Sequence, residues 1–176
     1  MRKCKVCKDP YTPTRPLQSV CGRFECAINQ GRAVQEKARR KAFRARKEHG
    51  RTRSDWIKLA QTDFNRFIRL RDSDLPCISC GRMHEGQWHA SHYRPTGQNS
   101  ALRFNEINCH RACQPCNTHK SGNLIPYRLE LVNRIGLELV EWLEKDHPKV
   151  TPWEIEELQA IRKYYQRAVK ALMNGE

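Results

Sequence analysis

The spacing of apolar residues predicts a mostly helical chain with one short region of strands. Between residues 54 and 72, apolar side chains recur every three or four positions, as they do on the buried face of a helix. These positions are Ile57, Ala60, Phe64, Phe67 and Ile68. Ser54 stands where such a helix would begin, with Asp55 in its first turn, so we expect Ser54 to be the N-cap.

Two stretches near the end of the chain show the same periodicity. The apolar positions of 127–146 are Leu129, Val132, Ile135, Leu139, Val140 and Leu143. Those of 152–173 are Ile155, Leu158, Ile161, Tyr165, Val169 and Leu172. The segment Thr151-Pro152-Trp153-Glu154 has the form of a capping box with proline at the first helical position. We therefore expect a C-terminal helical hairpin at 123–176, in which the two helices bury these stripes against each other.

Residues 27–53 are rich in helix-forming residues but carry few apolar ones. Ten Lys or Arg stand there against Glu36 and Glu48, a balance of +8. A helix with one weak apolar stripe and so many cations does not belong in a core. We expect a basic helical arm that lies along phosphates; a solvated linker helix is the alternative.

The middle of the chain, 54–122, combines the first of these helices with a region typical of strands. QWHASHY (87–93) and LRFNEIN (102–108) are strand-like, and the turn-forming PTGQNS lies between them. The segment after them suggests a helix that begins at the second cysteine pair of this region. The expected fold is therefore α+β, mostly helical, with a central ββα unit.

Eight of the nine cysteines fall into four closely spaced pairs. No run approaches the roughly 18 apolar residues of a membrane helix, and the start, MRKCKVCKDP, has no apolar segment like that of a signal peptide. We expect the chain to stay in the cytoplasm, where cysteine pairs bind metal more often than they form disulfides. The first two pairs predict an N-terminal zinc knuckle within 1–26, with ligands Cys4, Cys7, Cys21 and Cys26. The other two predict a structural zinc at the base of the ββα unit, with ligands Cys77, Cys80, Cys113 and Cys116.

A second set of zinc ligands is conceivable in the middle of the chain. Cys77 and Cys80 could combine with His89 and His92 as two cysteines and two histidines. In the common DNA-reading finger the histidine pair lies on a helix, about 12 residues after the cysteines. Here the spacing is shorter, the histidines lie in strand-like sequence, and the later cysteine pair would have no partners. We therefore favour the four-cysteine set.

The net charge of +14 and a pI near 9.7 indicate a polyanionic partner. Nucleic acid is the first candidate and an anionic membrane the second. The charge is uneven, because residues 128–176 carry eight basic and nine acidic residues. The positive charge therefore lies in the first three quarters of the chain.

One run of motifs resembles the zinc-bearing HNH, or His-Me finger, nucleases. It reads Cys77-x-x-Cys80, Ser91-His92-x-x-Pro95 and Asn108-x4-Cys113-x-x-Cys116-Asn117-x-x-Lys120. The H-x-x-H form, with asparagine after the last cysteine, is most similar to the phage endonuclease VII group. The order of segments over most of the chain resembles the NinG family of lambdoid phages, also called Rap.

The resemblance implies a metal-dependent, structure-specific endonuclease that nicks recombination intermediates such as Holliday junctions and D-loops. His92 would be the general base, Asn108 would tie the loop that aims it, and Asn117 would bind Mg²⁺ or Mn²⁺. Lys120 would hold a phosphate. Arg94 and Arg103 are further candidates for phosphate contacts. On the basic arm, the candidate DNA contacts are Arg39, Arg40, Arg44 and Lys47.

The sequence departs from the family pattern at Ser91, where those nucleases carry an aspartate metal ligand. His89, two residues earlier on the same strand face, could replace it, or Glu85 or Glu106 could reach in. An imidazole ligand would shift the preference toward Mn²⁺.

The resemblance also favours a homodimer, with phage recombination proteins as further partners. Resolving a four-way junction requires two nicks on opposed strands, one from each active site. Four apolar residues of the C-terminal helices lie off the two stripes and could form the interface: Leu131, Trp142, Trp153 and Tyr164. Two other functions remain open, a non-catalytic zinc protein that binds nucleic acid and a sequence-specific HNH nuclease.

Overall fold

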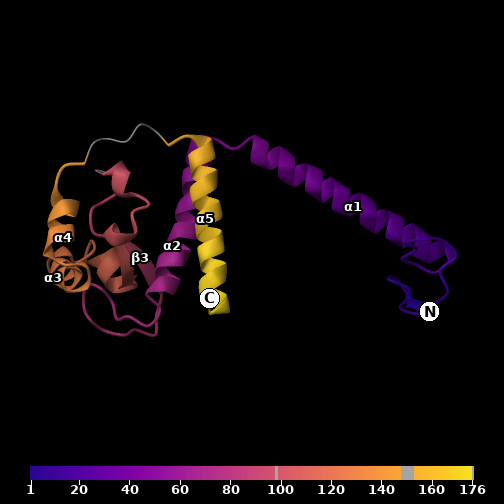
Figure 1. Ribbon diagram of the computed structural model, residues 1–176, viewed down its shortest axis with the longest axis horizontal. Helices are drawn as coiled ribbons and strands as arrows, with labels where there is room; N and C mark the ends of the chain where they lie inside the picture. The colour runs from indigo at the N-terminus through magenta and orange to yellow at the C-terminus, as the bar shows by residue number, and fades with distance from the viewer. Residues whose placement is uncertain (98, 148–152, 176) are drawn as a thin grey trace. The chain divides into compact units, whose positions relative to one another are not determined.

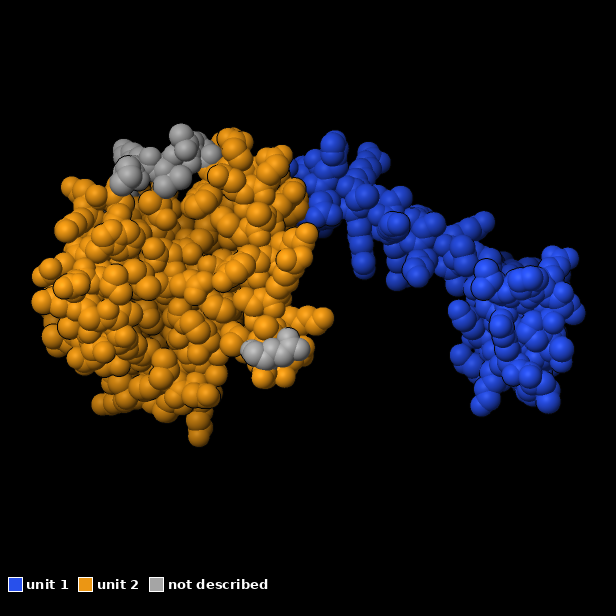
Figure 2. Space-filling view, in the orientation of Figure 1, with its two compact units in different colours: residues 1–51 blue, residues 52–176 orange. Residues whose placement is uncertain are grey.

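The computed structural model describes residues 1–97, 99–147 and 153–175 (Figure 1). The chain forms two compact units, Met1–Arg51 (unit 1) and Thr52–Glu176 (unit 2), coloured separately in Figure 2. Each unit is described by itself below. Within the described ranges, no helix has the length and apolar character needed to cross a membrane.

Unit 1 consists of a cysteine-bearing loop region and one long helix. Strand β1 (Arg2–Lys3) pairs antiparallel with β2 (Pro10–Tyr11). Helix α1 (Phe24–His49) follows, and Cys26 is its only buried residue. The expected basic helix is thus present, but it begins three residues before position 27 and ends four before position 53, because Gly50 caps it.

Unit 2 begins with helix α2 (Arg53–Arg71), whose N-cap is Thr52. The Thr52 hydroxyl accepts a hydrogen bond from the Asp55 N–H, and the Asp55 carboxylate accepts one from the Thr52 N–H. Our expectation of a Ser54 cap was wrong, because only Thr52 stands three residues before the carboxylate that completes this capping box. The buried face is close to the predicted stripe, with Trp56 in place of the half-buried Ile57.

The central sheet pairs β3 (Trp88–His92) antiparallel with β4 (Cys109–Cys113), and His92 lies opposite Cys109. The first predicted strand is confirmed, but the second, at 102–108, is wrong. One-turn helices η1 (Ser100–Leu102) and η2 (Glu106–Asn108) occupy that stretch. The Asn105 side chain accepts hydrogen bonds from two backbone N–H groups of η2, which turns the chain.

The helical segment after the second strand is shorter and later than expected. Cys113 ends β4, and η3 (Pro115–His119) is a single π-helical turn. The order strand, strand, helix is nevertheless present between residues 88 and 119.

The predicted helix at 127–146 is divided into α3 (Leu124–Ile135) and α4 (Leu137–Glu144). Gly136 separates them with a φ of +85°, a conformation that side chains other than glycine rarely adopt. The buried positions of this segment are Tyr127, Leu131, Val140 and Leu143. Leu129 of the predicted stripe is 64% exposed, whereas Leu131, expected at a free surface, is buried.

The last helix, α5 (Ile155–Asn174), packs on α2 (Figure 1). Tyr165 and Val169 of α5 join Phe64 and Phe67 in one apolar cluster. The predicted C-terminal hairpin is therefore wrong, because the apolar face of α2 needs a cover and α5 supplies it. The cap of α5 is Glu154, whereas the predicted helix start at residues 151 and 152 lies outside the described residues.

Candidate metal centres and active site

The four cysteines of unit 1 come together as the spacing predicts. The Sγ atoms of Cys4, Cys7, Cys21 and Cys26 all lie within 4.8 Å of one another. Burial would raise the pKa of the Cys4 thiol, but hydrogen bonds from backbone N–H groups, that of Cys21 first, lower it to about 6. Four thiolates at this separation suit a tetrahedral zinc ion.

A second cluster lies at the base of the central sheet of unit 2. The Sγ atoms of Cys77, Cys80, Cys113 and Cys116 also lie within 4.8 Å of one another. The Cys113 N–H points at Cys77 Sγ, at 3.4 Å. Since these four thiols gather without His89 or His92, the alternative set of two cysteines and two histidines is excluded. Both clusters could hold zinc.

His84 is a residue of the second centre that the sequence did not reveal. It is half-buried, its Nε2 lies 3.3 Å from Cys80 Sγ, and its ring meets the edge of Trp88. A histidine beside a metal-bound thiolate can donate a hydrogen bond to it and orient it. The only available signal was the spacing of four residues from Cys80.

Asn108 is fully buried and fastens the loop that follows β3. Its Oδ1 accepts from the Arg94 N–H at 2.8 Å, and its Nδ2 donates to the carbonyls of Arg94 and Leu102 at 3.1 and 3.2 Å. One amide therefore closes the segment between residues 94 and 102. This is the position expected of a residue that ties the loop next to His92.

His92, at the end of β3, is held in one orientation. Its ring stacks on Phe64, with 5.8 Å between centroids, and its Nε2 lies 2.9 Å from the Arg103 carbonyl oxygen. A carbonyl only accepts hydrogen bonds, so Nε2 carries the hydrogen and Nδ1 carries the lone pair. Burial lowers the pKa of His92 below its usual value, which keeps the ring neutral at neutral pH.

His89 is in contact with Asn117, which directly follows the cysteine-cluster residue Cys116. Asn117 Nδ2 lies 3.0 Å from His89 Nδ1, and His89 Nε2 is buried without a hydrogen-bond partner. His89 and His92 are three positions apart in β3, so their side chains leave the strand on opposite faces. The structure therefore joins His89 to Asn117, and His92 to Arg103, as two separate groups.

The other residues considered as replacements for the aspartate ligand do not contact Asn117. Ser91 is 2% exposed, and its backbone carbonyl accepts a hydrogen bond from the Tyr127 hydroxyl. Glu106 accepts a hydrogen bond from Tyr165, and Glu85 is exposed. Among the described residues proposed for this role, His89 is the one in contact with Asn117.

The segment after His92 has a further anchor that the sequence did not reveal. The Tyr93 hydroxyl donates to Glu144 at 2.5 Å, and Arg128 binds both oxygens of that carboxylate at 2.7 and 3.0 Å. The network ties the end of β3 to α3 and α4. No spacing pattern could have linked residues 51 positions apart.

The candidate phosphate contacts of unit 2 differ in solvent exposure. Lys120 is exposed just after η3, and Arg94 is half-buried. Arg103 is half-buried, with its Nη1 3.4 Å from Gln61 Oε1. Lys120 is therefore the most accessible cation of the three.

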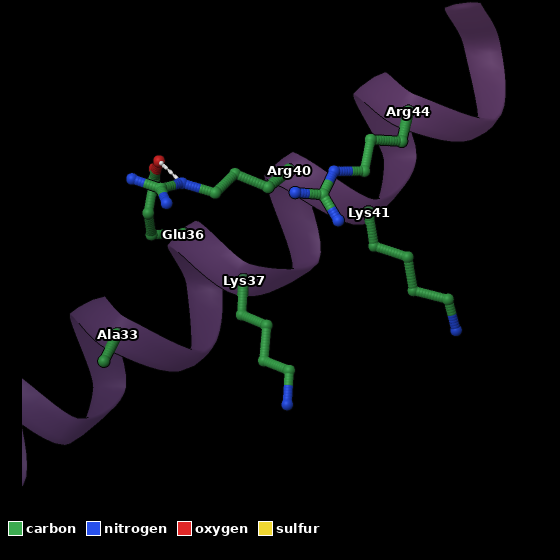
Figure 3. A pocket seen from close by; sticks show the side chains of 6 residues that line it. All are labelled: Ala33, Glu36, Lys37, Arg40, Lys41 and Arg44. Atoms are coloured by element: carbon green, nitrogen blue, oxygen red, sulfur yellow. Dashed lines mark hydrogen bonds and ion pairs between the residues drawn. The ribbon is translucent and has the colours of Figure 1, made fainter. Parts of the chain in front are cut away.

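The candidate contacts of unit 1 all lie on α1. All four are exposed, and two of them, Arg39 and Arg40, pair with Glu36 at 3.1 and 2.8 Å. Figure 3 shows the Glu36–Arg40 pair on one side of the helix and the side chains of Lys37 and Lys41 extending on another.

Two of the four apolar residues considered for a dimer interface remain exposed. Trp142 and Tyr164 are 40% and 58% exposed. Leu131 is in the core, and Trp153 packs against Phe104 inside the unit. The surface left for a partner is thus smaller than the sequence suggested.

Comparison with known proteins identifies the family. Residues 1–176 match the family described as Bacteriophage Lambda NinG protein. The protein ninG of Escherichia phage lambda is 49% identical over 194 residues, which cover 99% of this chain and 94% of that protein. The protein ninG of Salmonella phage P22 is 47% identical (99% and 95% covered), and that of Escherichia phage 933W is 43% identical (99% and 94% covered). No solved structure matches the chain. The chain thus belongs to the NinG family of lambdoid phage proteins.

Proposed function

We propose that this protein is a metal-dependent endonuclease of the HNH class that nicks branched DNA, such as Holliday junctions and D-loops. The observation that carries the proposal is the orientation of His92. The Arg103 carbonyl fixes its tautomer, burial keeps it neutral, and Asn108 closes the adjoining loop. The preference for branched DNA rests on the family resemblance alone.

The chemistry assigned to these residues is hydrolysis of a phosphodiester. His92 Nδ1 takes a proton from a water molecule, whose oxygen attacks phosphorus. The bond from phosphorus to the 3′ oxygen breaks, and that oxygen leaves with the electron pair and is then protonated by solvent. The Arg103 carbonyl holds the ring throughout and stabilises the imidazolium that forms.

His89 and Asn117 fit the catalytic cation that the family implies. While Asn117 Nδ2 donates to His89 Nδ1, the neutral ring carries its hydrogen on Nε2. A cation would therefore bind at Nδ1 in place of this hydrogen bond, with the Asn117 side-chain oxygen as a second ligand. Mg²⁺ or Mn²⁺ bound there would neutralise charge on the scissile phosphate, and the imidazole would favour Mn²⁺. The two four-cysteine clusters each hold one zinc ion and stabilise the fold.

The partner is DNA, and unit 1 supplies most of the attraction. Fifteen of the 33 Lys and Arg and four of the 19 Asp and Glu fall within residues 1–51, a net of +11, against +3 for unit 2. The protein acts in the cytoplasm of the bacterial host, where the DNA and the phage recombination proteins are found.

We also propose a homodimer, since two nicks on opposed strands require two active sites. Light scattering at micromolar concentration decides this: a mass of about 41 kDa, twice the 20.7 kDa chain, supports the dimer. A monomer mass that persists with junction DNA bound contradicts it.

The test of function uses labelled linear duplex, single strand, fork and four-way junction, with Mg²⁺, Mn²⁺ or EDTA. Cutting of branched DNA alone, and only with a cation, is the expected result. Binding without cutting of every substrate would support a non-catalytic zinc protein instead. Cutting of linear duplex at one sequence would support a sequence-specific nuclease.

A further inference from the structure

Helix α1 has one face without charge. Positions three, four or seven residues apart lie on one side of a helix. Along α1 those positions are Phe24, Ala27, Ile28, Gly31, Val34, Gln35, Ala38, Ala42 and Ala45. All nine are exposed within unit 1, and seven of them are no larger than valine or are polar only through an amide. The structure of unit 1 leaves this face without a partner.

Two rows of cations border the uncharged face. Arg32, Arg39 and Arg46 recur every seven residues along one edge. Lys37 and Lys41, four positions apart, follow the other edge. Together with Ala33, Glu36, Arg40 and Arg44 they line a depression that extends to the far side of α1 (Figure 3). Glu36, the acid within this stretch, lies in that depression, away from the uncharged face, and pairs there with Arg39 and Arg40.

This arrangement matches the major groove of a B-form duplex. That groove is about 12 Å wide and admits an α-helix, and phosphates line both of its walls. Twenty-six residues at about 1.5 Å each give α1 a length of roughly 39 Å, slightly more than one turn of duplex. Small uncharged side chains let the helix approach the base edges while the cations on each side reach the two backbones.

We propose that α1 inserts into the major groove of duplex DNA, with its uncharged face toward the bases. This rests on the proposed function only in taking DNA as the partner. The expected basic arm only follows a phosphate backbone. The present proposal also states which face of α1 lies toward the bases and that the duplex has the B form.

Two other occupants fit the same face less well. A second α1 in a parallel coiled coil would place Lys41 near Arg46 of the partner helix, where like charges repel. An anionic membrane needs large apolar side chains to enter the bilayer interface, and from residue 31 to residue 45 this face carries only glycine, valine, glutamine and alanine. The net charge of +11 on unit 1 favours the polyanion.

The test enlarges the uncharged face without changing charge. Ala38→Leu and Ala42→Leu, made singly and together in the full chain, add bulk on that face. Ala33→Leu, outside the face and beside the cations of the depression, is the matched control for one such change. Leucine and alanine differ little in helix propensity, so α1 should persist in all of these variants. The His92→Ala variant in EDTA serves as the background, so that affinity is measured on uncut DNA. Each protein is titrated with a 20-base-pair DNA duplex and with an RNA duplex of the same sequence.

The expected result is about tenfold weaker binding of duplex DNA by the double variant, with the control within twofold of the parent. The parent should also prefer DNA to RNA, because the deep, narrow major groove of A-form RNA excludes a helix. Equal DNA affinity in all of these proteins would overturn the groove assignment while leaving DNA binding intact. Stronger self-association of the double variant would assign the face to a second copy. Failure of the parent to bind any DNA would count against the proposed function itself.

Discussion

The two units build a four-cysteine cluster into different surroundings. In unit 1, Cys4, Cys21 and Cys26 are themselves the buried core, with half-buried Val6, Tyr11 and Val20 around them. In unit 2, the cluster is one edge of a larger core that includes Ile78, Tyr93, Leu102 and Tyr127. Since cysteines make up the buried core of unit 1, metal–ligand bonds would replace packing there and would add to it in unit 2.

The units also differ in what they leave exposed. Helix α1 buries one residue of 26, whereas α2 buries five of 19 and packs under α5. A helix without a core to cover is free to carry cations on most of its surface. The difference predicts that substitutions in unit 1 can lower DNA affinity and that substitutions in unit 2 can abolish the proposed cleavage, each without the other effect.

The largest effect should come from removing one ligand of each cluster. Cys26→Ser should unfold unit 1 and leave the melting of unit 2 unchanged, because no other core holds unit 1. Cys113→Ser should unfold the centre of unit 2, since zinc binding to such sites supplies roughly 10 kcal/mol or more. Elemental analysis should find two zinc ions in the parent and one in each variant. A single zinc ion in the parent would remove one centre.

The next largest effect concerns the proposed general base. His92→Ala should reduce junction cleavage by roughly a thousandfold, because a positioned base contributes about 10² to 10⁴. Junction affinity should stay within twofold, since His92 is a neutral ring packed on Phe64 and is not one of the cations proposed to bind phosphates. The control is His119→Ala, an exposed histidine of η3, which should cleave normally. Cleavage near the parental rate in His92→Ala would refute the assignment.

Removing positive charge from unit 1 should lower the affinity for DNA more than removing it from unit 2. Replacing Arg39, Arg40, Arg44 and Lys47 by Gln should weaken binding of every DNA shape by roughly ten- to a hundredfold. The slope of log affinity against log salt should fall by up to about 0.9 for each phosphate that the protein no longer neutralises. Arg53, Lys58, Lys163 and Lys170 are four exposed cations of unit 2, and their replacement by Gln is the matched control. If the unit 1 variant has the same salt slope as the unit 2 control, helix α1 is a solvated linker and does not bind phosphates.

The smallest effect is a pH dependence confined to unit 2. Burial lowers the pKa of His110 to about 4. Between pH 6.5 and about 4, the imidazole is therefore protonated in the unfolded chain and neutral in the folded chain. Stability therefore falls as pH drops through that window, by about 1 kcal/mol for this residue between pH 7 and 5.5. His110→Gln should flatten the change in denaturant midpoint by that amount, and His119→Gln should not. Parallel curves for all three proteins would exclude His110 as the cause.

The sequence predicted the helices and the metal clusters better than it predicted the sheet and the packing partners. Cysteine spacing encodes a metal site directly, and the stripe of α2 appears in the periodicity from Ala60 to Ile68. Strand-like character at 102–108 was misleading, because the polar groups of Asn105 and Asn108 bond to backbone there. Those bonds depend on contacts that periodicity does not contain.

Packing partners were the other failure. The stripe of α5 was recognised, but nothing in its sequence says whether it covers α2 or the preceding helices. His89 next to Asn117 was one of three replacements considered for the missing aspartate, whereas His84 at Cys80 and Glu144 at Tyr93 follow from the fold alone.

The short link between the units has a consequence for how the protein samples its substrate. Gly50 ends α1 and Thr52 caps α2, so the two helices are separated by three residues, a reach of about 14 Å. With α1 held on a duplex, unit 2 is tethered at an effective concentration in the millimolar range, far above that of free protein in a cell. Weak intrinsic affinity of unit 2 for its own DNA segment is then sufficient. If unit 2 cuts DNA as proposed, cleavage would be an intramolecular search within a short radius of the bound arm.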